Sequence, residues 1–173
     1  SLIIFLPVFI LGCRPDYIEE NKVVQKIDTL SLNIFSREGE KIYSITSPYS
    51  TYNNIEHEFQ LKKTSINIFK GKEIKYIINS DESTLSDNNK LLKLNGNVEL
   101  KTINQNQDVL KGDNFIWNIE ETDYLLKGNI RFENKNIILN STKAKLGKDD
   151  IIEFFKPVKY IIKDENNNNK SVT

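Results

Sequence analysis

The chain contains few residues whose types and spacing could support catalysis or metal binding. Its one histidine, His57, lies between two glutamates, and its one cysteine is Cys13. A metal or acid-base site needs several convergent side chains, and a His/Cys cluster cannot be assembled from one residue of each type. We therefore interpret His57 as a surface residue and predict that the protein has no metal and no cofactor. A lone cysteine also excludes a disulfide within the chain.

Carboxylates are the remaining candidates for chemistry, because a pair of them can serve as the acid and nucleophile of a glycosidase. They fall in predicted turns such as Glu120-Glu121 and Asp149-Asp150, where solvation explains them. Spacing in sequence does not reveal a distance in space, so a carbohydrate-active enzyme with two carboxylates in a cleft stays open as an alternative. The sequence marks no such pair, and we predict that the protein is not an enzyme.

Composition indicates one soluble globular domain with a core of its own. The 173 residues are 38% hydrophobic and 28% charged, and 24 basic residues balance 24 acidic ones. Nucleic-acid binding needs an excess of positive charge, which is missing here. We predict no nucleic-acid partner.

The N-terminal segment, residues 1–13, is predicted to be a signal peptide or membrane anchor. Its apolar run is shorter than the roughly 20 residues that cross a bilayer but has the length of a signal-peptide hydrophobic region. It ends in Ile10-Leu11-Gly12-Cys13, which resembles a bacterial lipobox and makes Cys13 a candidate for lipidation. The alternative is a free cysteine at the end of an ordinary signal or anchor. Either form attaches the domain to a membrane.

Residues 14–27 are predicted to be a linker and residues 164–173 a disordered, Asn-rich tail, which leaves 28–163 as the folded domain. Only 16–26 could form a helix. The domain itself alternates apolar and polar residues, which is typical of β-strands with one dry face. Polar turns separate the predicted strands: 29–36, 42–47, 56–62, 64–70, 73–79, 91–102, 109–118, 124–133, 136–141, 151–155 and 158–163.

Two strands carry the same unusual pattern, an apolar stripe interrupted by Gly-Asn, at 92–100 and 124–132. Glycine at this place leaves a notch on the apolar face and permits a bulge or a sharp bend. A small residue followed by a polar stretch and a large apolar residue recurs from Ser47, Ser80, Gly112 and Ser141. A period of roughly 30 residues indicates stacked units that share one core.

Long, bent, one-sided strands joined by short turns predict an all-β fold. We expect an antiparallel β-jelly-roll, an open twisted trough of two facing curved sheets. Trp117 is predicted to lie on the dry side, either as packing between the sheets or as a wall of a lipid-accepting interior. The predicted interior stripe consists of Leu32, Ile34, Ile45, Phe59, Leu61, Ile66, Ile68, Leu94, Val98, Leu100, Phe115, Trp117, Leu126, Ile130 and Phe132.

The order of these motifs resembles the periplasmic lipopolysaccharide-transport proteins of the LptC type, which share the OstA-like repeat with LptA. The resemblance covers about residues 28–163 and rests on four segments: Ile34–Ser47, Ser80–Leu85, the L-x-L-x-G-N-V-x-L element at 92–100, and Asp113–Asn118.

The resemblance implies that the interior stripe binds the acyl chains of lipopolysaccharide or a related glycolipid, without metal, cofactor or catalysis. It also implies partners: the jelly-roll domains of an inner-membrane ABC transporter (LptF/LptG-like) at the N-terminal edge, and an LptA-like bridge at the C-terminal edge. The protein would then lie at the periplasmic face of the inner membrane, anchored by its N-terminus. We expect 30–36 or the neighbouring strand at the transporter end and 158–163 at the bridge end.

This interpretation depends on apolar walls that stay far enough apart to leave a slot along the molecule. The alternative is a structural or interaction lipoprotein that uses a closed β-sandwich without lipid transport. A fully filled interior would favour that alternative.

Overall fold

The structure is a computed structural model that describes residues 24–86, 88, 90–103, 108–119, 124–147, 149–155, 158–163 and 170–172. Within these ranges, no helix is long and apolar enough to cross a membrane. The predicted anchor, Cys13 and the predicted helical part of the linker up to residue 23 lie outside them.

The described residues form one antiparallel sheet in which most strands pair with their neighbours in sequence. The alternating pattern predicted most of these strands. They are β1 (Val24–Ile27), β2 (Leu30–Phe35), β3 (Lys41–Ser47), β4 (Tyr49–Asn53), β5 (Glu58–Lys70), β6 (Glu73–Ser86), β7 (Leu91–Thr102), β8 (Val109–Asn118), β9 (Tyr124–Glu133), β10 (Ile137–Leu146), β11 (Ile152–Phe155), β12 (Lys159–Ile162) and β13 (Lys170–Val172).

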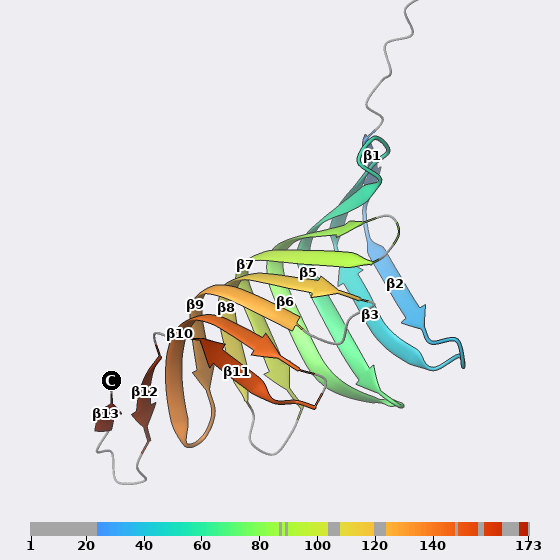
Figure 1. Cartoon of the computed structure of the whole chain (residues 1–173). Helices are drawn as coiled ribbons and strands as arrows, with labels where there is room; N and C mark the ends of the chain where they lie inside the picture. Colours follow the sequence, from blue (N-terminus) through green and yellow to red (C-terminus); the bar gives the residue numbers. More distant parts are fainter. Residues whose placement is uncertain are drawn as a thin grey trace, which may run out of the picture.

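The sheet bends back on itself, so that each long strand contributes to two layers (Figure 1). Strand pairing defines the layers, because β5 pairs with β3 through one half and with β4 through the other. Layer I contains β2, β3, 64–70, 73–80, 98–102, 109–112, 130–133, 137–141, β12 and β13. Layer II contains β1, β4, 58–62, 82–86, 91–95, 114–118, 124–127, 143–146 and β11. This is the predicted all-β jelly-roll trough, formed by one continuous sheet.

The bends form a line across the sheet, and the side opposite that line is the open mouth of the trough. Breaks in register mark the bends between Asn79 and Glu82 in β6, Asn95 and Val98 in β7, Lys111 and Asn114 in β8, and Ser141 and Lys143 in β10. The sequence repeat that begins at 47, 80, 112 and 141 therefore coincides with the bends of alternate strands.

Serine side chains stabilise several of these bends. The hydroxyl of Ser47 donates to the carbonyl of Tyr49 at 2.8 Å, that of Ser80 to Glu82 at 3.1 Å, and that of Ser141 to Lys143 at 3.1 Å. Each bond joins a serine side chain on one side of a bend to a backbone carbonyl on the other, where the ladder bonds between strands are interrupted.

The Gly-Asn pairs produce the bends of β7 and β9. Gly96 and Asn97 both adopt left-handed backbone, with φ of 73° and 46°. Glycine and asparagine tolerate this conformation best. The Asn97 amide donates to the Asp81 carboxylate at 2.6 Å, and Asn129 repeats this contact with Asp113 at 2.7 Å. The predicted bend is confirmed, but the predicted notch is wrong: Gly96 is exposed and lies against Asp81 outside the core.

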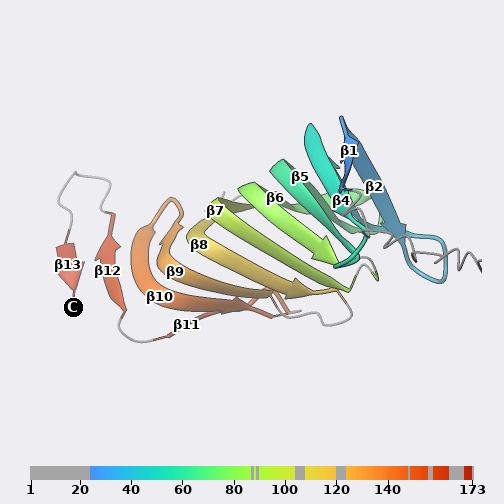
Figure 2. The same ribbon diagram turned by 90° about the horizontal axis from the view of Figure 1, so that it is seen from above.

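The structure differs from the sequence prediction at both ends of the sheet and in one strand within it. Residues 24–27 of the predicted linker form β1, which pairs with β4 instead of forming a helix. Residues 170–172 of the predicted disordered tail form β13, which pairs with β12. The strands predicted at 56–62 and 64–70 are one strand, β5, bent near Lys63 at a φ of 51°. The strands lie in order from β1 and β2 at one end to β12 and β13 at the other (Figure 2).

Candidate functional site

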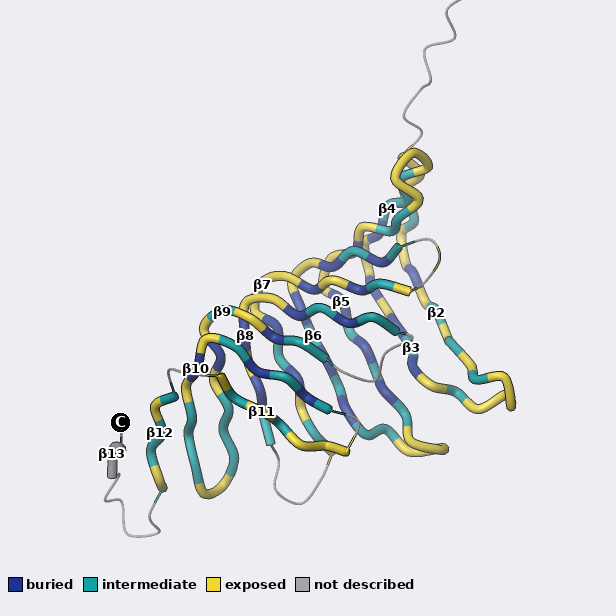
Figure 3. Tube along the Cα trace, viewed as in Figure 1, coloured by how far each residue is buried: buried dark blue, intermediate teal, exposed yellow. Residues whose placement is uncertain are grey.

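The predicted interior stripe faces the space between the two layers. Four of its residues, at both ends of the sheet, are partly buried and pack against the core: Leu32, Ile34, Phe59 and Phe132. The other eleven are buried, each at most 5% exposed: Ile45, Leu61, Ile66, Ile68, Leu94, Val98, Leu100, Phe115, Trp117, Leu126 and Ile130. Buried positions alternate along the strands through the middle of the sheet (Figure 3).

The two layers are in contact through the centre of the molecule. The rings of Tyr43 in layer I and Trp117 in layer II meet edge to face, with centroids 4.9 Å apart. Phe132 in layer I and Phe154 in layer II make a second contact between the layers, with their rings tilted and centroids 5.6 Å apart. The slot that the sequence analysis expected is therefore closed along the central stripe, because its walls pack directly on each other. Trp117 is a packing residue between the layers.

Tyr43 is the exception in this apolar interior. Its side chain is 0% exposed, yet its hydroxyl has no hydrogen-bond partner among the described residues. Burial raises the pKa of Tyr43 to about 12, so the hydroxyl keeps its proton and remains a donor. An unsatisfied buried hydroxyl costs about 1–3 kcal/mol, so an apolar side chain would stabilise this position better.

A polar cluster links the two layers at the mouth. We call it the clasp, and it consists of Lys75 and Tyr76 of β6 in layer I and Asp150 of the β10–β11 loop in layer II. The Tyr76 hydroxyl donates to Asp150 Oδ1, and Lys75 Nζ forms an ion pair with the same oxygen. Burial raises the pKa of Asp150, but the hydrogen bonds from Lys75 and Tyr76 outweigh burial and lower it below the ordinary value. Burial and the contact with Asp150 raise the pKa of Tyr76.

Two hollows open at the mouth on either side of the clasp, and all three clasp residues line both of them. One, of about 430 Å³, lies towards the N-terminal end of the sheet and is also lined by Ile42, Ile68 and Tyr124. The other, of about 160 Å³, is lined by apolar residues that include Leu100, Leu146 and Ile152. Apolar side chains of the interior are therefore reached from the mouth beside the clasp.

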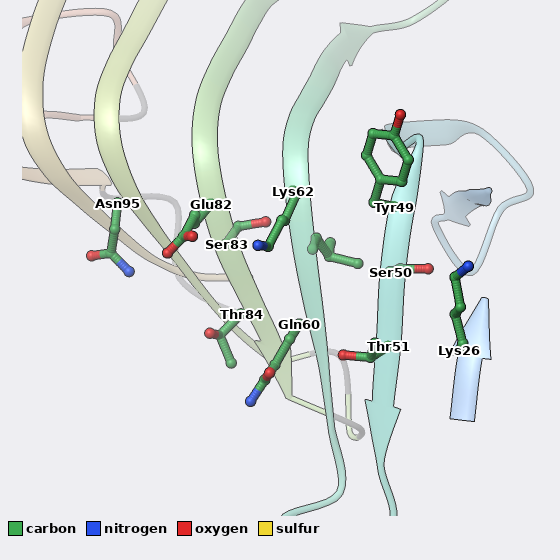
Figure 4. A pocket seen from close by; sticks show the side chains of 11 residues that line it. Lys26, Tyr49, Ser50, Thr51, Gln60, Lys62, Glu82, Ser83, Thr84 and Asn95 are labelled. Carbon is green, nitrogen blue, oxygen red and sulfur yellow. The ribbon is translucent and has the colours of Figure 1, made fainter. Parts of the chain in front are cut away.

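Other hollows lie away from the clasp, on the outer faces of the sheet and beside the β2–β3 hairpin. The one in Figure 4, about 460 Å³, is lined on the outside of layer II by Lys62, Glu82, Thr84 and their neighbours. Another contains two carboxylates, Glu99 and Asp113. Hydrogen bonds from Lys101, together with Lys111, lower the pKa of Glu99, which is opposite to what a general acid requires. The glycosidase alternative therefore gains no support from this pair.

The remaining candidate residues do not converge. His57 lies in the exposed turn between β4 and β5. Within the described ranges, no group of three or more His, Cys, Asp or Glu side chains could bind a metal ion. Glu120-Glu121 and Cys13 lie outside those ranges. Asp150 lies in an exposed turn, as predicted, and it also contacts Tyr76 and Lys75 across the mouth, which the sequence analysis did not predict.

The sheet has open edges at its ends, where another strand could add. At the N-terminal end, β1 is the edge of layer II and β2, expected there from the sequence, is the edge of layer I. At the C-terminal end, β11 is the edge of layer II. The predicted docking strand β12 is not an edge here, because β13 pairs with it through Tyr160, Ile161 and Ile162.

The family of the chain follows from comparison with known sequences. The family described as "Lipopolysaccharide-assembly, LptC-related" matches residues 10–163, which includes nearly every described strand. The chain belongs to this LptC-related family. No curated protein sequence matches it significantly.

A solved structure shares the fold of this LptC-related chain. It is the crystal structure of LptH from Pseudomonas aeruginosa, described as the LptA homologous periplasmic component of the conserved lipopolysaccharide transport device. The two chains align with a TM-score of 0.52 over 76% of this chain and 94% of LptH, at 6% sequence identity. At this identity the likeness concerns the fold: an antiparallel β-jelly-roll with a trough between its layers.

Proposed function

We propose that this LptC-related protein is a membrane-anchored periplasmic bridge that binds the acyl chains of lipopolysaccharide between its two layers. It accepts lipopolysaccharide from an inner-membrane ABC transporter and passes it to an LptA-like partner. No step of this transfer requires catalysis by the chain. The anchor is the N-terminal segment, with lipidation at Cys13.

One observation carries the proposal: an apolar interior that runs through every long strand and comes within reach of solvent at both ends and beside the clasp. Each CH₂ group of an acyl chain that leaves water gains about 0.8 kcal/mol. An interior lined by Leu, Ile and Phe side chains removes the cost of crossing water, while sugars and phosphates stay hydrated outside the mouth. Family membership and the trough fold support the same function.

The open edges support docking at both ends, because an exposed strand can extend its sheet into that of a partner. We assign the transporter to the edge formed by β1 and β2, as the family resemblance implies. The LptA-like partner is assigned to the C-terminal end, where β11 is free and β12 becomes free when β13 leaves.

The closed centre favours a second candidate, a structural lipoprotein with a permanently packed sandwich. The two candidates differ in whether the layers separate. Under the transport proposal, bound acyl chains replace the contact between Tyr43 and Trp117.

A charge placed in the interior tests the choice. In Phe132→Arg the new guanidinium faces a partly buried position at the C-terminal end, where it opposes acyl chains. The matched control is Gln60→Arg, on the outer face of layer II. We expect lipopolysaccharide that copurifies with the protein from cells to be lost in Phe132→Arg and retained in Gln60→Arg. Equal retention in two folded variants would exclude the transport proposal and leave the structural lipoprotein.

A further inference from the structure

Two features of the trough bear on how a ligand could enter. The clasp links the layers at the mouth, and the buried Tyr43 hydroxyl is a hydrogen-bond donor without a partner among the described residues. The clasp joins the layers through one carboxylate, Asp150, whose side chain is 46% exposed. Its partners Lys75 and Tyr76 both come from the mouth end of β6. A link that is half-exposed to water and polar on both sides can break without exposing a charge to an apolar surrounding.

Tyr43 does not line the larger hollow itself, but neighbours of its ring do. Tyr43 pairs in register with Ile68, which lines that hollow, and Ile42 beside it lines the hollow as well. On the opposite wall, Tyr124 lines the hollow and contacts Trp117, the ring that packs on Tyr43. A ligand that enters beside the clasp and separates these aromatic rings therefore reaches the unpaired hydroxyl.

The position of Tyr43 along its strand suggests which part of a ligand it meets. It is the third residue of β3, counted from the mouth. Acyl chains that point towards the bends would place their head linkage near the mouth. That linkage, an ester or amide carbonyl, accepts hydrogen bonds, whereas the chain below it does not.

We propose that the mouth beside the clasp is a gated loading site for an acyl lipid. Release of Asp150 from Tyr76 and Lys75 admits the chains, and the Tyr43 hydroxyl donates to the ester or amide carbonyl at their head. The inference rests on the proposed function and adds to it a gate and a polar contact.

Trp117 makes the site measurable, because it is the single tryptophan of the chain and is 3% exposed. The probe is synthetic lipid A with brominated acyl chains, since bromine quenches tryptophan fluorescence only at close range. The purified full-length chain is mixed with the probe, and the rate and the midpoint of Trp117 quenching are recorded. Tyr76→Phe removes one of the two contacts of Asp150, and Asp150→Asn removes the charge that strengthens both, so each variant weakens the clasp with little change of shape. Lys111→Gln is the control, because it removes an ion pair with Glu99 inside layer I alone.

If opening of the clasp limits lipid entry, losing a charge-assisted hydrogen bond lowers the cost of opening. We therefore expect quenching to be roughly tenfold faster in both clasp variants than in the wild type. Lys111→Gln should match the wild type. If all four proteins are quenched at one rate, the gate is excluded while lipid binding stands. If none is quenched, the gate and the proposed function are both excluded.

For the polar contact, Tyr43→Phe separates a ligand role from a packing role. Removal of an unpaired buried hydroxyl should raise the unfolding midpoint of the lipid-free protein. The same change should raise the lipid concentration at the quenching midpoint about three- to tenfold, which corresponds to the loss of one hydrogen bond. Unchanged lipid affinity in Tyr43→Phe would show that this hydroxyl does not bind the lipid carbonyl, whether or not the unfolding midpoint rises.

Discussion

Tyr43 and Trp117 lie on strands separated in the sheet by β5, β6 and β7, yet their rings are 4.9 Å apart. Such a contact is formed only because the sheet bends back on itself. It joins layer I to layer II at the centre of the core, and it is the contact that bound acyl chains would have to replace.

Trp117→Ala should therefore be strongly destabilising in the lipid-free protein. Deleting a buried aromatic side chain costs about 3–5 kcal/mol, because the transfer free energy is lost and a cavity remains. Denaturant unfolding followed by circular dichroism measures the effect. Tyr49→Ala is the control, since Tyr49 is 58% exposed, and its change should stay below about 1 kcal/mol. A loss as small as that of the control would mean that the layers are not held by this contact.

The bend of β9 gives a second prediction. Gly128 has a φ of 76°, and a Cβ added there would lie 2.6 Å from Asp113 Oδ2. Gly39, in the β2–β3 hairpin, has a φ of 85° but open space around it. Both substitutions to alanine carry backbone strain of about 1 kcal/mol, and only Gly128→Ala adds the collision. We expect Gly128→Ala to unfold at clearly lower denaturant than Gly39→Ala. Equal midpoints would show that the Asp113 contact does not restrict the bend.

Most of the fold could be predicted from the sequence because alternation along a strand records which face is dry. Leu94, Val98 and Leu100 are buried as the stripe predicted. The repeat that begins at Ser47 and Ser80 marks bends, because a small or glycine residue is needed where the ladder is interrupted. β4 was missed because its buried residue is Ser50, which breaks the apolar alternation.

The clasp could not be predicted, because Tyr76 and Asp150 are 74 residues apart and belong to different layers. Only the fold-over brings them together, and a carboxylate in a Gly-Lys-Asp-Asp turn has no sequence signal that distinguishes it from a solvated one. The closed centre was likewise hidden, since an apolar stripe reports that a face is dry and not how far apart two such faces lie.

The clasp should also weaken in acid. The lowered pKa of Asp150 means that its contribution to stability is present above the ordinary carboxyl pKa of 3.8 and is lost as pH falls through the lowered pKa. Lys70, Lys75, Tyr76 and Tyr124 are the charged or titratable groups that influence it. The pKa values of Tyr76 and Tyr124 are raised, so both hydroxyls stay protonated in that range. Protonation of the Asp150 carboxylate is therefore the step that changes.

Acrylamide quenching of Trp117 measures this opening. We expect the extent of quenching to stay constant from neutral pH down to about pH 4 and to rise below that pH. In Asp150→Asn, quenching should already be higher at neutral pH and should lack that part of the rise. Glu99 and Glu133, whose pKa values are also lowered, remain in the variant, so the difference between the two profiles isolates Asp150. Identical profiles would contradict the clasp as the link at the mouth.

Because β13 pairs with β12, it competes with any partner strand that adds to β12. Ser171 pairs with Ile161 at the middle of β13, and proline at position 171 removes a backbone donor from that pairing. If the LptA-like partner adds its strand to β12, Ser171→Pro should bind it more tightly, because β13 no longer competes. Biolayer interferometry with the purified partner measures the change. Unchanged affinity would move the docking edge to β11.

Photocrosslinking from two adjacent residues of β9 tests the central claim most directly. Phe132 faces the interior and Arg131 faces outward, so a benzoylphenylalanine at each position samples opposite faces of one strand within a single residue step. In cells we expect adducts with lipopolysaccharide at position 132 and none at position 131. Adducts at both positions or at neither would contradict a lipid path between the two layers.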